Sequence, residues 1–330
     1  MSWLSRAIDA GGEYRNPLDD IEDGLFLTTG AKRAKTSQFW VLLVLASMIA
    51  AGGVVGDSTP AVIGAMIVAP LATPIYGVAL ATVTGSRKDL FASLGLLVAG
   101  IAVNILIGYL IGVVTFDRMP VDVNPQIVGR TAPTLLDLAV AVTVGLAGSF
   151  ALVRRDVSNI LAGVAIAISL VPVLAVVGIT LGSGRKDLAW GAFILFLTNA
   201  AAIIVAGVVV FTAAGYERTA TERGRHPRRR AKILIAVLVV VLIVPLGAAS
   251  IRTYAYERWV GDTTDAANAW ASGSDWRIES VKLVGTDIVI SAVGPGDPPP
   301  TDGLQKDVRA SVPTSVGVQM LEGSGTTIEL

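Results

Sequence analysis

Residues 57–75 read DSTPAVIGAMIVAPLATPI, a polar start followed by an apolar run with prolines at positions 70 and 74. The apolar run continues to Thr84, which gives the length of about 20 residues that a helix needs to cross a bilayer. Each proline removes a backbone donor and clashes with the carbonyl four residues earlier, which frees the carbonyls of Met66 and Pro70. Such carbonyls are tolerated in a membrane where they are buried in protein, bonded by hydroxyls or lining a wet cavity. The stretch predicts a broken membrane helix.

Composition supports this reading of the whole chain. Of 330 residues, 53% are hydrophobic and 16% are charged, outside the soluble globular norm. The sequence has no cysteine, and its single histidine, His226, lies in a basic run typical of a solvated face. Disulfides, thiolate nucleophiles, histidine triads and multi-histidine metal sites are therefore excluded. We expect no enzyme, no metal or other cofactor, and no nucleic-acid partner; the expected partners are the lipid bilayer and an unknown small solute or ion.

Seven apolar segments are long enough to span a membrane: roughly 38–56, 59–84, 89–115, 134–153, 158–182, 188–214 and 231–251. The residues after them change character. A short helix over 263–271, strands over 277–283 and 287–293, a helix over 301–310 and strands over 316–321 and 326–330 follow in turn. The predicted fold class is an all-α polytopic membrane protein of seven transmembrane helices with a small C-terminal α+β soluble domain.

Basic residues in the loops set the expected orientation. One set of alternate loops holds Lys32, Arg33, Lys35, Arg87, Lys88, Arg154, Arg155 and the cluster from Arg218 to Lys232. The other set holds only Arg118, Arg130, Arg185 and Lys186. The rule places the N-terminus in the cytoplasm, and an odd number of spans places the residues from about 252 outside the cell membrane.

An internal similarity divides the spans into two sets of three. The run Arg-Lys-Asp-Leu occurs at residues 87–90 and again at 185–188, an offset of 98 residues that also carries Pro74 onto Pro172. Because three spans is an odd number, the second copy must be inverted relative to the first. The expected divisions are a cytoplasmic segment (1–37), repeat 1 (38–115), inverted repeat 2 (134–214), a basic loop (215–230), a seventh helix (231–251) and the extracytoplasmic domain (252–330).

The candidate binding residues follow from these broken, repeated helices, since transporter sites form near the midplane at discontinuous helices. Pro70, Pro74 and Pro172 break the helices, with hydroxyls supplied by Ser58, Thr73 and Ser169. Exposed carbonyls there would coordinate a cation or a polar solute. The alternative is a packing kink, which is common in membrane helices.

Buried amides and carboxylates complete the candidate site. Asn104 and Asn199 are the amides most deeply placed in apolar surroundings, where they serve as interhelical hydrogen bonds or as solute contacts. Asp57 and Asp156, with Ser158, open the second and fifth spans. A carboxylate inside a membrane is a functional candidate by default, although a position near a helix N-terminus also explains it.

Glycines recur four residues apart, at 52 and 56 and at 108 and 112, with further glycines at 64, 77 and 163. Small residues in this pattern allow helices to approach closely. They predict packing within the monomer or, as an alternative, a homo-oligomer through the small-residue helix faces.

The motif Ser58-x(4)-Ile63-Gly64-Ala65-Met66-x-x-Ala69-Pro70-Leu71-x-x-Pro74-Ile75 resembles the signature of a bacterial and archaeal family of uncharacterised hydrophobic membrane proteins, the domain of unknown function 389. The resemblance covers about residues 38–180 and implies a polytopic membrane protein without implying an activity. Ala72 and Thr73 precede the second proline, where the family pattern has a methionine.

Two functions fit the sequence. The first is a transporter- or channel-like protein that handles a small solute or ion at the interface of the two inverted repeats. The alternative is a non-transporting sensor or assembly protein that displays the extracytoplasmic α+β domain.

Overall fold

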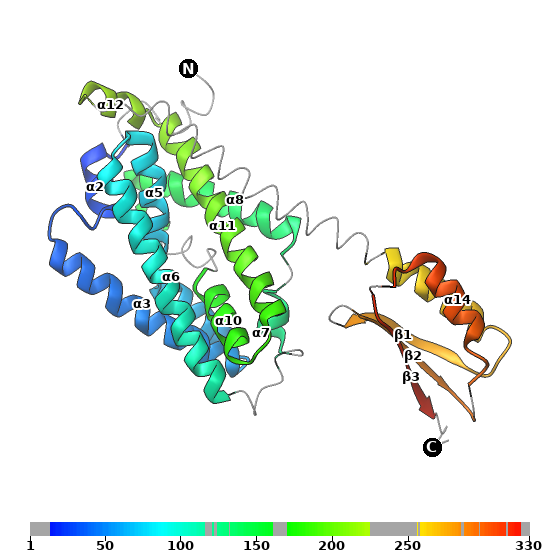
Figure 1. Cartoon of the computed structure of the whole chain (residues 1–330). Helices are drawn as coiled ribbons and strands as arrows, with labels where there is room; N and C mark the ends of the chain where they lie inside the picture. Colours follow the sequence, from blue (N-terminus) through cyan, green and yellow to red (C-terminus); the bar gives the residue numbers. More distant parts are fainter. Residues whose placement is uncertain are drawn as a thin grey trace. The chain divides into compact units, whose positions relative to one another are not determined.

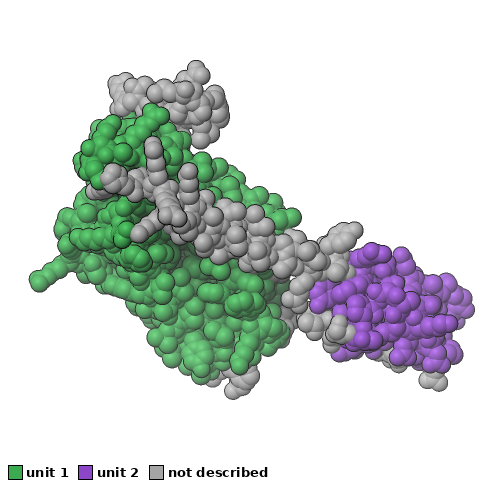
Figure 2. Space-filling view, turned by 45° about the horizontal axis from the view of Figure 1, so that its top comes forward, with its two compact units in different colours: residues 1–247 green, residues 248–330 purple. Residues whose placement is uncertain are grey.

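The computed structural model of the chain describes residues 14–115, 121, 124–131, 133–160, 170–224, 256, 258–284, 287–296, 298–314 and 316–324. Only the backbone is described for residues 158–160, 283–284, 287 and 322–324. The chain forms two compact units, Met1–Gly247 and Ala248–Leu330, drawn in green and purple in Figure 2. The predicted spans lie in the first unit, except that span 231–251 falls outside the described residues.

The first unit is helical throughout its described elements (Figure 1). They are α2 (Leu18–Leu25), α3 (Lys32–Val55), α4 (Thr59–Val68), α5 (Ala72–Thr84), α6 (Arg87–Thr115), α7 (Pro125–Val128), α8 (Leu135–Val153), η2 (Arg155–Ile160), α10 (Leu170–Gly182), α11 (Lys186–Ala213) and α12 (Tyr216–Glu222). By length and composition, α3, α6, α8 and α11 can each cross a membrane. The helices α4 and α5 together make a fifth pass that is bent by 43°, and α10 is a shorter apolar helix.

Hydrogen bonds sort the helix ends into two groups, here called the α2 end and the α7 end. At the α2 end, Thr28 donates to Asp89 at the start of α6 (2.6 Å), and the Asn16 amide donates to the Leu152 carbonyl near the end of α8 (2.7 Å). At the α7 end, Asn124 donates to the Val54 carbonyl and Gln126 donates to Thr59. Successive loops thus alternate between the two ends, as they must in a chain that crosses a bilayer repeatedly.

Apolar side chains cover the outer faces of the helices. Phe91, Val98 and Val114 on α6 are 71%, 63% and 81% exposed, and Met48 on α3 is 55% exposed. A continuous apolar exterior of this size is unusual on a soluble monomer. It fits hydrocarbon, because a helix bonds its interior backbone groups within itself.

Glycines on α6 and α10 bring these two helices into backbone contact. A Cβ added at Gly108 would lie 2.6 Å from the Ala175 carbonyl oxygen and 3.1 Å from the Cα of Gly178. The pair Gly108 and Gly112 therefore packs within the monomer, as one predicted alternative holds, against a second glycine pair at 178 and 182. On α3, by contrast, Gly52 faces open space, and its neighbour Gly53 makes the close contact, to Val62 of α4.

Residues 14–29, which we call the N-terminal strap, tie the helix ends together at the α2 end. Arg15 donates to the Ala214 carbonyl after α11 (2.8 Å), and the Asn16 carbonyl accepts from the Tyr216 hydroxyl (2.7 Å). Ion pairs join Asp20 to Arg155 and Asp19 to Arg223. These pairs are exposed and each contributes little, but the strap as a whole contacts both halves of the membrane unit.

The second unit contains a helix over residues 258–271, β1 (Arg277–Val284), β2 (Asp287–Gly294), α14 (Asp302–Ser311) and β3 (Val318–Ser324). β1 and β2 are antiparallel, whereas β3 lies parallel to β2 on its other side. Ala267, Ile288, Ile290, Leu304 and Val308 form its core. The predicted α+β order is confirmed for these elements.

One part of the expected second unit differs. The sequence predicts a strand that ends at residue 321, but β3 continues to Ser324 and includes Gly323. A parallel partner needs a crossover connection, and α14 supplies it between β2 and β3. The predicted strand over 326–330 lies outside the described residues.

We expect Gly108→Ala to destabilise the membrane unit by about 1–3 kcal/mol, because the added methyl group overpacks the α6–α10 contact. Gly95→Ala on the same helix is the matched control, since its Cβ would meet nothing within 4 Å. That control should be neutral or stabilising by up to about 1 kcal/mol. Thermal unfolding of the purified variants in detergent measures both, and equal midpoints for the two would contradict the close contact.

Candidate functional site

The candidate site begins at the break between α4 and α5. The Ser58 hydroxyl accepts a hydrogen bond from the Ala61 N–H (3.4 Å) and caps α4, and Thr59 is the first helical residue. α4 ends at Ala69 in an extended conformation, because a residue before proline avoids the helical region. The chain then turns into α5 at an angle of 43°.

The prolines of this break leave less backbone unpaired than the sequence suggested. The Pro70 carbonyl accepts a hydrogen bond from the Thr73 N–H at 3.1 Å, so it is not free. Pro74 is the third residue of α5, where an N–H has no partner inside the helix and its absence costs nothing. Pro74 is buried, and Pro70 and Thr73 are half-buried.

The described part of the fifth predicted span is α10, with Pro172 buried near its beginning. Ile168 and Ser169, which the sequence placed beside Pro172, lie outside the described residues. Close to Pro172, the Asn104 amide of α6 donates to the Val171 carbonyl at 3.3 Å. Asn104 has no exposed surface, and its Oδ1 has no hydrogen-bond partner among the described residues. A buried carbonyl oxygen without a donor is costly, so this atom is a strong candidate for a solute or water contact.

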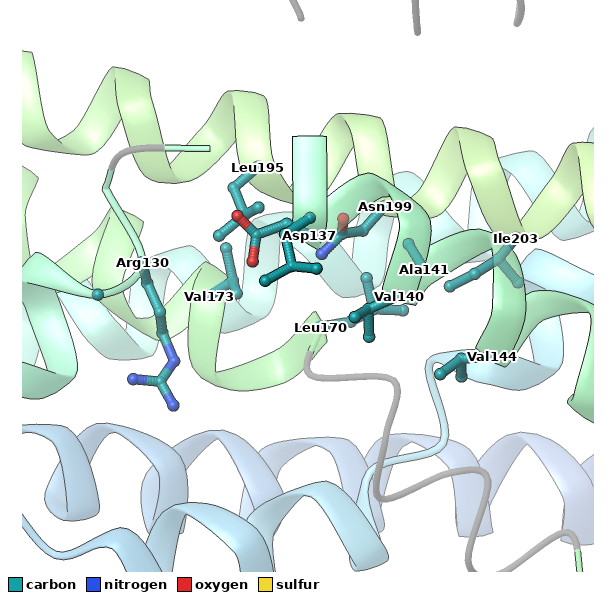
Figure 3. Close-up of a pocket in the computed structure, with 12 residues that line it drawn as sticks. Arg130, Asp137, Val140, Ala141, Val144, Leu170, Val173, Leu195, Asn199 and Ile203 are labelled. Atoms are coloured by element: carbon teal, nitrogen blue, oxygen red, sulfur yellow. The ribbon is translucent and has the colours of Figure 1, made fainter. Parts of the chain in front are cut away.

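Asn199 of α11 lines a cavity of about 320 Å³ between α8, α10 and α11. Figure 3 shows Arg130 and Asn199 on either side of Asp137 in this lining, with Val140, Val144 and Leu170 among its aliphatic side chains. The Oδ1 of Asn199 is buried and also lacks a partner among the described residues. The cavity lies beside α10, within the second predicted repeat.

The carboxylates at the openings of the second and fifth spans lie apart from these residues. Asp57 is exposed in the turn between α3 and α4, with a left-handed φ of 45°, beside the capping Ser58. Asp156 lies at the α2 end, in η2 with Ser158. It accepts two hydrogen bonds from Arg154, which lower the pKa of its carboxyl below the ordinary value. The structure thus brings Asn104 to Val171, next to Pro172, and places Asn199 in the cavity lining. It places the two carboxylates at opposite ends.

Three polar residues, Tyr76, Ser149 and Arg130, were not among the candidates from the sequence. Tyr76 of α5 is buried and donates to the Gly145 carbonyl of α8 (3.5 Å), which also accepts from Ser149 (2.6 Å). At the α7 end, Arg130 is half-buried, and desolvation lowers the pKa of its guanidinium. A single tyrosine or a loop arginine carries no motif, so only the packing of α5 on α8 and of the loop on α4 reveals them.

The candidate groups are amides, hydroxyls and backbone carbonyls, which can bond a polar solute or coordinate a cation. Within the described residues, no group of three or more His, Asp or Glu side chains could hold a metal ion.

The fold and these residues define a class, an α-helical polytopic membrane protein with an appended α+β unit. The model of the family described as domain of unknown function DUF389 matches residues 66–205, from α4 into α11. An uncharacterised protein of Methanocaldococcus jannaschii is 31% identical over 241 residues, which cover 72% of this chain and 74% of the relative. No solved structure is a significant match. The chain belongs to the DUF389 family.

We expect Pro74→Ala to change the free energy of unfolding by less than about 1 kcal/mol, because Pro74 occupies the first turn of α5. If Pro74 interrupted a continuous helix, the same substitution would stabilise the protein by about 3 kcal/mol. Near-ultraviolet circular dichroism of the detergent-solubilised protein on heating separates the two outcomes. Ala79→Pro, in the buried interior of α5, is the destabilising control.

Proposed function

We propose that this protein is transporter- or channel-like and handles a small solute or ion at the interface of two inverted repeats. The proposed role is binding and passage rather than catalysis. In this proposal the N-terminus is cytoplasmic, the protein is a multi-pass protein of the cell membrane, and residues 252–330 lie outside. The observation that carries it is that helix ends recur at an offset of 98 residues and helix contacts recur at an offset of 99 residues.

Helix ends support the repeat. Val55 and Val153 end α3 and α8, Thr84 and Gly182 end α5 and α10, and Thr115 and Ala213 end α6 and α11; the members of each pair are 98 residues apart. The offset is the one that relates the two Arg-Lys-Asp-Leu runs. Since α3 ends at the α7 end and α8 at the α2 end, equivalent helices run in opposite directions.

Helix contacts support it independently. Gly108 of α6 packs on Gly178 of α10, and Gly207 of α11 packs on Ala79 of α5. Gly207 follows Gly108 by 99 residues, and Gly178 follows Ala79 by 99. The two contacts therefore exchange when the proposed repeats are exchanged, as a pseudo-two-fold axis requires.

The proposed passage runs along the broken helices at mid-depth. In α4–α5 the break follows 10 helical residues from one end and precedes 13 from the other, so it lies near the bilayer centre. Asn104, near the middle of α6, faces the start of α10 there. Discontinuous helices at the midplane are where transporters of inverted-repeat design bind their substrates.

We expect Asn104→Leu to reduce flux at least about tenfold in liposomes, tested with a panel of monovalent cations and neutral amino acids. Its thermal stability should stay close to that of the wild type. Ser47→Ala is the control, because the Ser47 hydroxyl is buried but only back-bonds to the Leu43 carbonyl of its own helix (2.7 Å).

If Asn104 is only an interhelical hydrogen bond, the variant instead loses roughly 0.6–1.7 kcal/mol of stability and keeps its flux. Wild-type protein that passes no member of the panel would favour the alternative, a sensor or assembly protein displaying residues 252–330.

Reporter fusions test the proposed topology. A fusion after residue 87 should report the cytoplasm, whereas fusions after residues 185 and 252 should report the outside. Asp89 bonds to Thr28 at the α2 end, whereas Gly191 near the start of α11 lies against Thr131 in the loop that follows α7. These contacts support opposite locations for residues 87 and 185. A cytoplasmic location for residue 252 would contradict the count of seven spans.

A further inference from the structure

Arg130 lines the cavity between α8, α10 and α11, and its guanidinium has no ion-pair partner among the described residues. Its Nη1 donates to the carbonyl and the Oε1 of Gln126, at 2.8 and 3.0 Å. Its Nε and Nη2 donors have no partner among the described residues, and no carboxylate there lies within ion-pair distance. A guanidinium offers five donors in a planar fork that matches a carboxylate, and most of this fork is unused.

A chain of hydrogen bonds holds Arg130 in place. Asn124 fixes the loop by donating to the Val54 carbonyl (3.0 Å) and by capping α7. Gln126, which orients Arg130, is itself held by donating to the Thr59 hydroxyl (2.9 Å). The guanidinium is therefore preorganised, which lowers the entropy cost of binding a ligand.

Asp137 supplies the opposite charge to the same cavity. Its Oδ2 accepts from the backbone N–H and the hydroxyl of Thr134 in a capping box, at 2.8 and 2.7 Å. Its Oδ1 has no hydrogen-bond partner among the described residues. The capping box accounts for one oxygen of the carboxylate and leaves the other available.

Arg130 and Asp137 do not pair with each other, although both line one cavity. Two arginine–aspartate pairs elsewhere in the first unit each pair through two hydrogen bonds. Arg154 binds Asp156 at 2.8 and 2.6 Å, and Arg185 binds Asp187 at 3.1 and 2.8 Å. The separated pair in the cavity leaves room for a ligand that carries both charges.

The rest of the lining is apolar. Val140, Val144, Leu170, Val173 and Leu195 surround the space, with the Asn199 amide as a further polar group (Figure 3). A volume of about 320 Å³ lies at the small end of known ligand pockets. An aliphatic body with one cationic and one anionic group matches this surface.

We propose that the cavity binds a zwitterionic solute of the amino-acid class, with its carboxylate on Arg130, its ammonium on Asp137 and its aliphatic side chain among Val140, Leu170 and Leu195. This inference rests on the proposed function and names its substrate class. The site lies within the second repeat and opens near the α7 end, so it is an entry site for the proposed passage.

Leucine binding to the full chain in phosphatidylcholine nanodiscs tests the proposal by isothermal titration calorimetry. Isocaproate lacks the ammonium, and isoamylamine lacks the carboxylate. We expect each to bind at least about tenfold more weakly than leucine, because each leaves one charged group unpaired. Arg130→Gln and Asp137→Asn should each weaken leucine by a similar factor, and Arg130→Lys should weaken it less than Arg130→Gln.

The matched control is the double variant Arg185→Gln with Asp187→Asn, which removes a pair that is already satisfied and should leave leucine binding unchanged. Equal binding of leucine and isocaproate to the wild type would overturn the proposal without any variant having to fold. Competition by phosphatidylethanolamine, whose headgroup is also zwitterionic, would assign the site to lipid and overturn a soluble occupant. Calorimetry measures binding and not flux. A negative binding result therefore rejects this site, whereas a negative Asn104 flux result rejects the proposed passage.

Discussion

A backbone that crosses hydrocarbon must satisfy its own hydrogen-bonding groups, and the membrane unit depends on this constraint wherever a helix stops. At the break of α4 and α5, the Ser58 hydroxyl caps one helix and the Pro70 carbonyl is bonded by Thr73. Pro74 then falls where no N–H is needed. The same constraint accounts for most hydroxyls inside the helices: Thr82, Thr180 and Thr198 each donate to a carbonyl of their own helix. Polar residues in these spans are thus mainly structural. The few polar groups without such a partner are the candidates for binding.

Asn104 and Asn199 are those exceptions, because an amide has an acceptor that its own helix cannot satisfy. Their Oδ1 atoms remain without donors among the described residues, in a region where most other polar groups are paired. The backbones of α6 and α10 are in contact at Gly108, so these two helices cannot move closer together there. The unpaired Oδ1 of Asn104 is more significant for this reason. Gly108, which stabilises the helix contact, and Asn104, a candidate site residue, therefore lie one turn apart on α6.

Signals within each segment predicted the bounds of the helices well. They predicted poorly which helices and strands pack together. Apolar length and capping residues placed α3, α6, α8 and α11 within a few residues of their observed bounds, because each signal lies within the helix itself. Gly178 and Gly182 were missed since a glycine pair shows its role only once its partner helix is known. Asp137 is not among the sequence candidates, because an aspartate in a capping box needs no further role, although the box uses only one of its two carboxylate oxygens. Arg130 was counted only as a loop charge, because its place in the cavity lining depends on how the loop packs beside α8, α10 and α11. The parallel placement of β3 required the crossover through α14, which strand patterns alone do not specify.

The N-terminal strap has a consequence for how the protein is made. Residues 14–29 leave the ribosome well before their partners Leu152, Ala214 and Tyr216, which are synthesised between one and two hundred residues later. The strap therefore waits unpaired until α8 and then α11 have been inserted. Its closure over Tyr216 and Arg223 is among the last steps of assembly of these helices. A chain with a misplaced helix could not complete these bonds and would expose the strap to the proteases that remove unassembled membrane proteins.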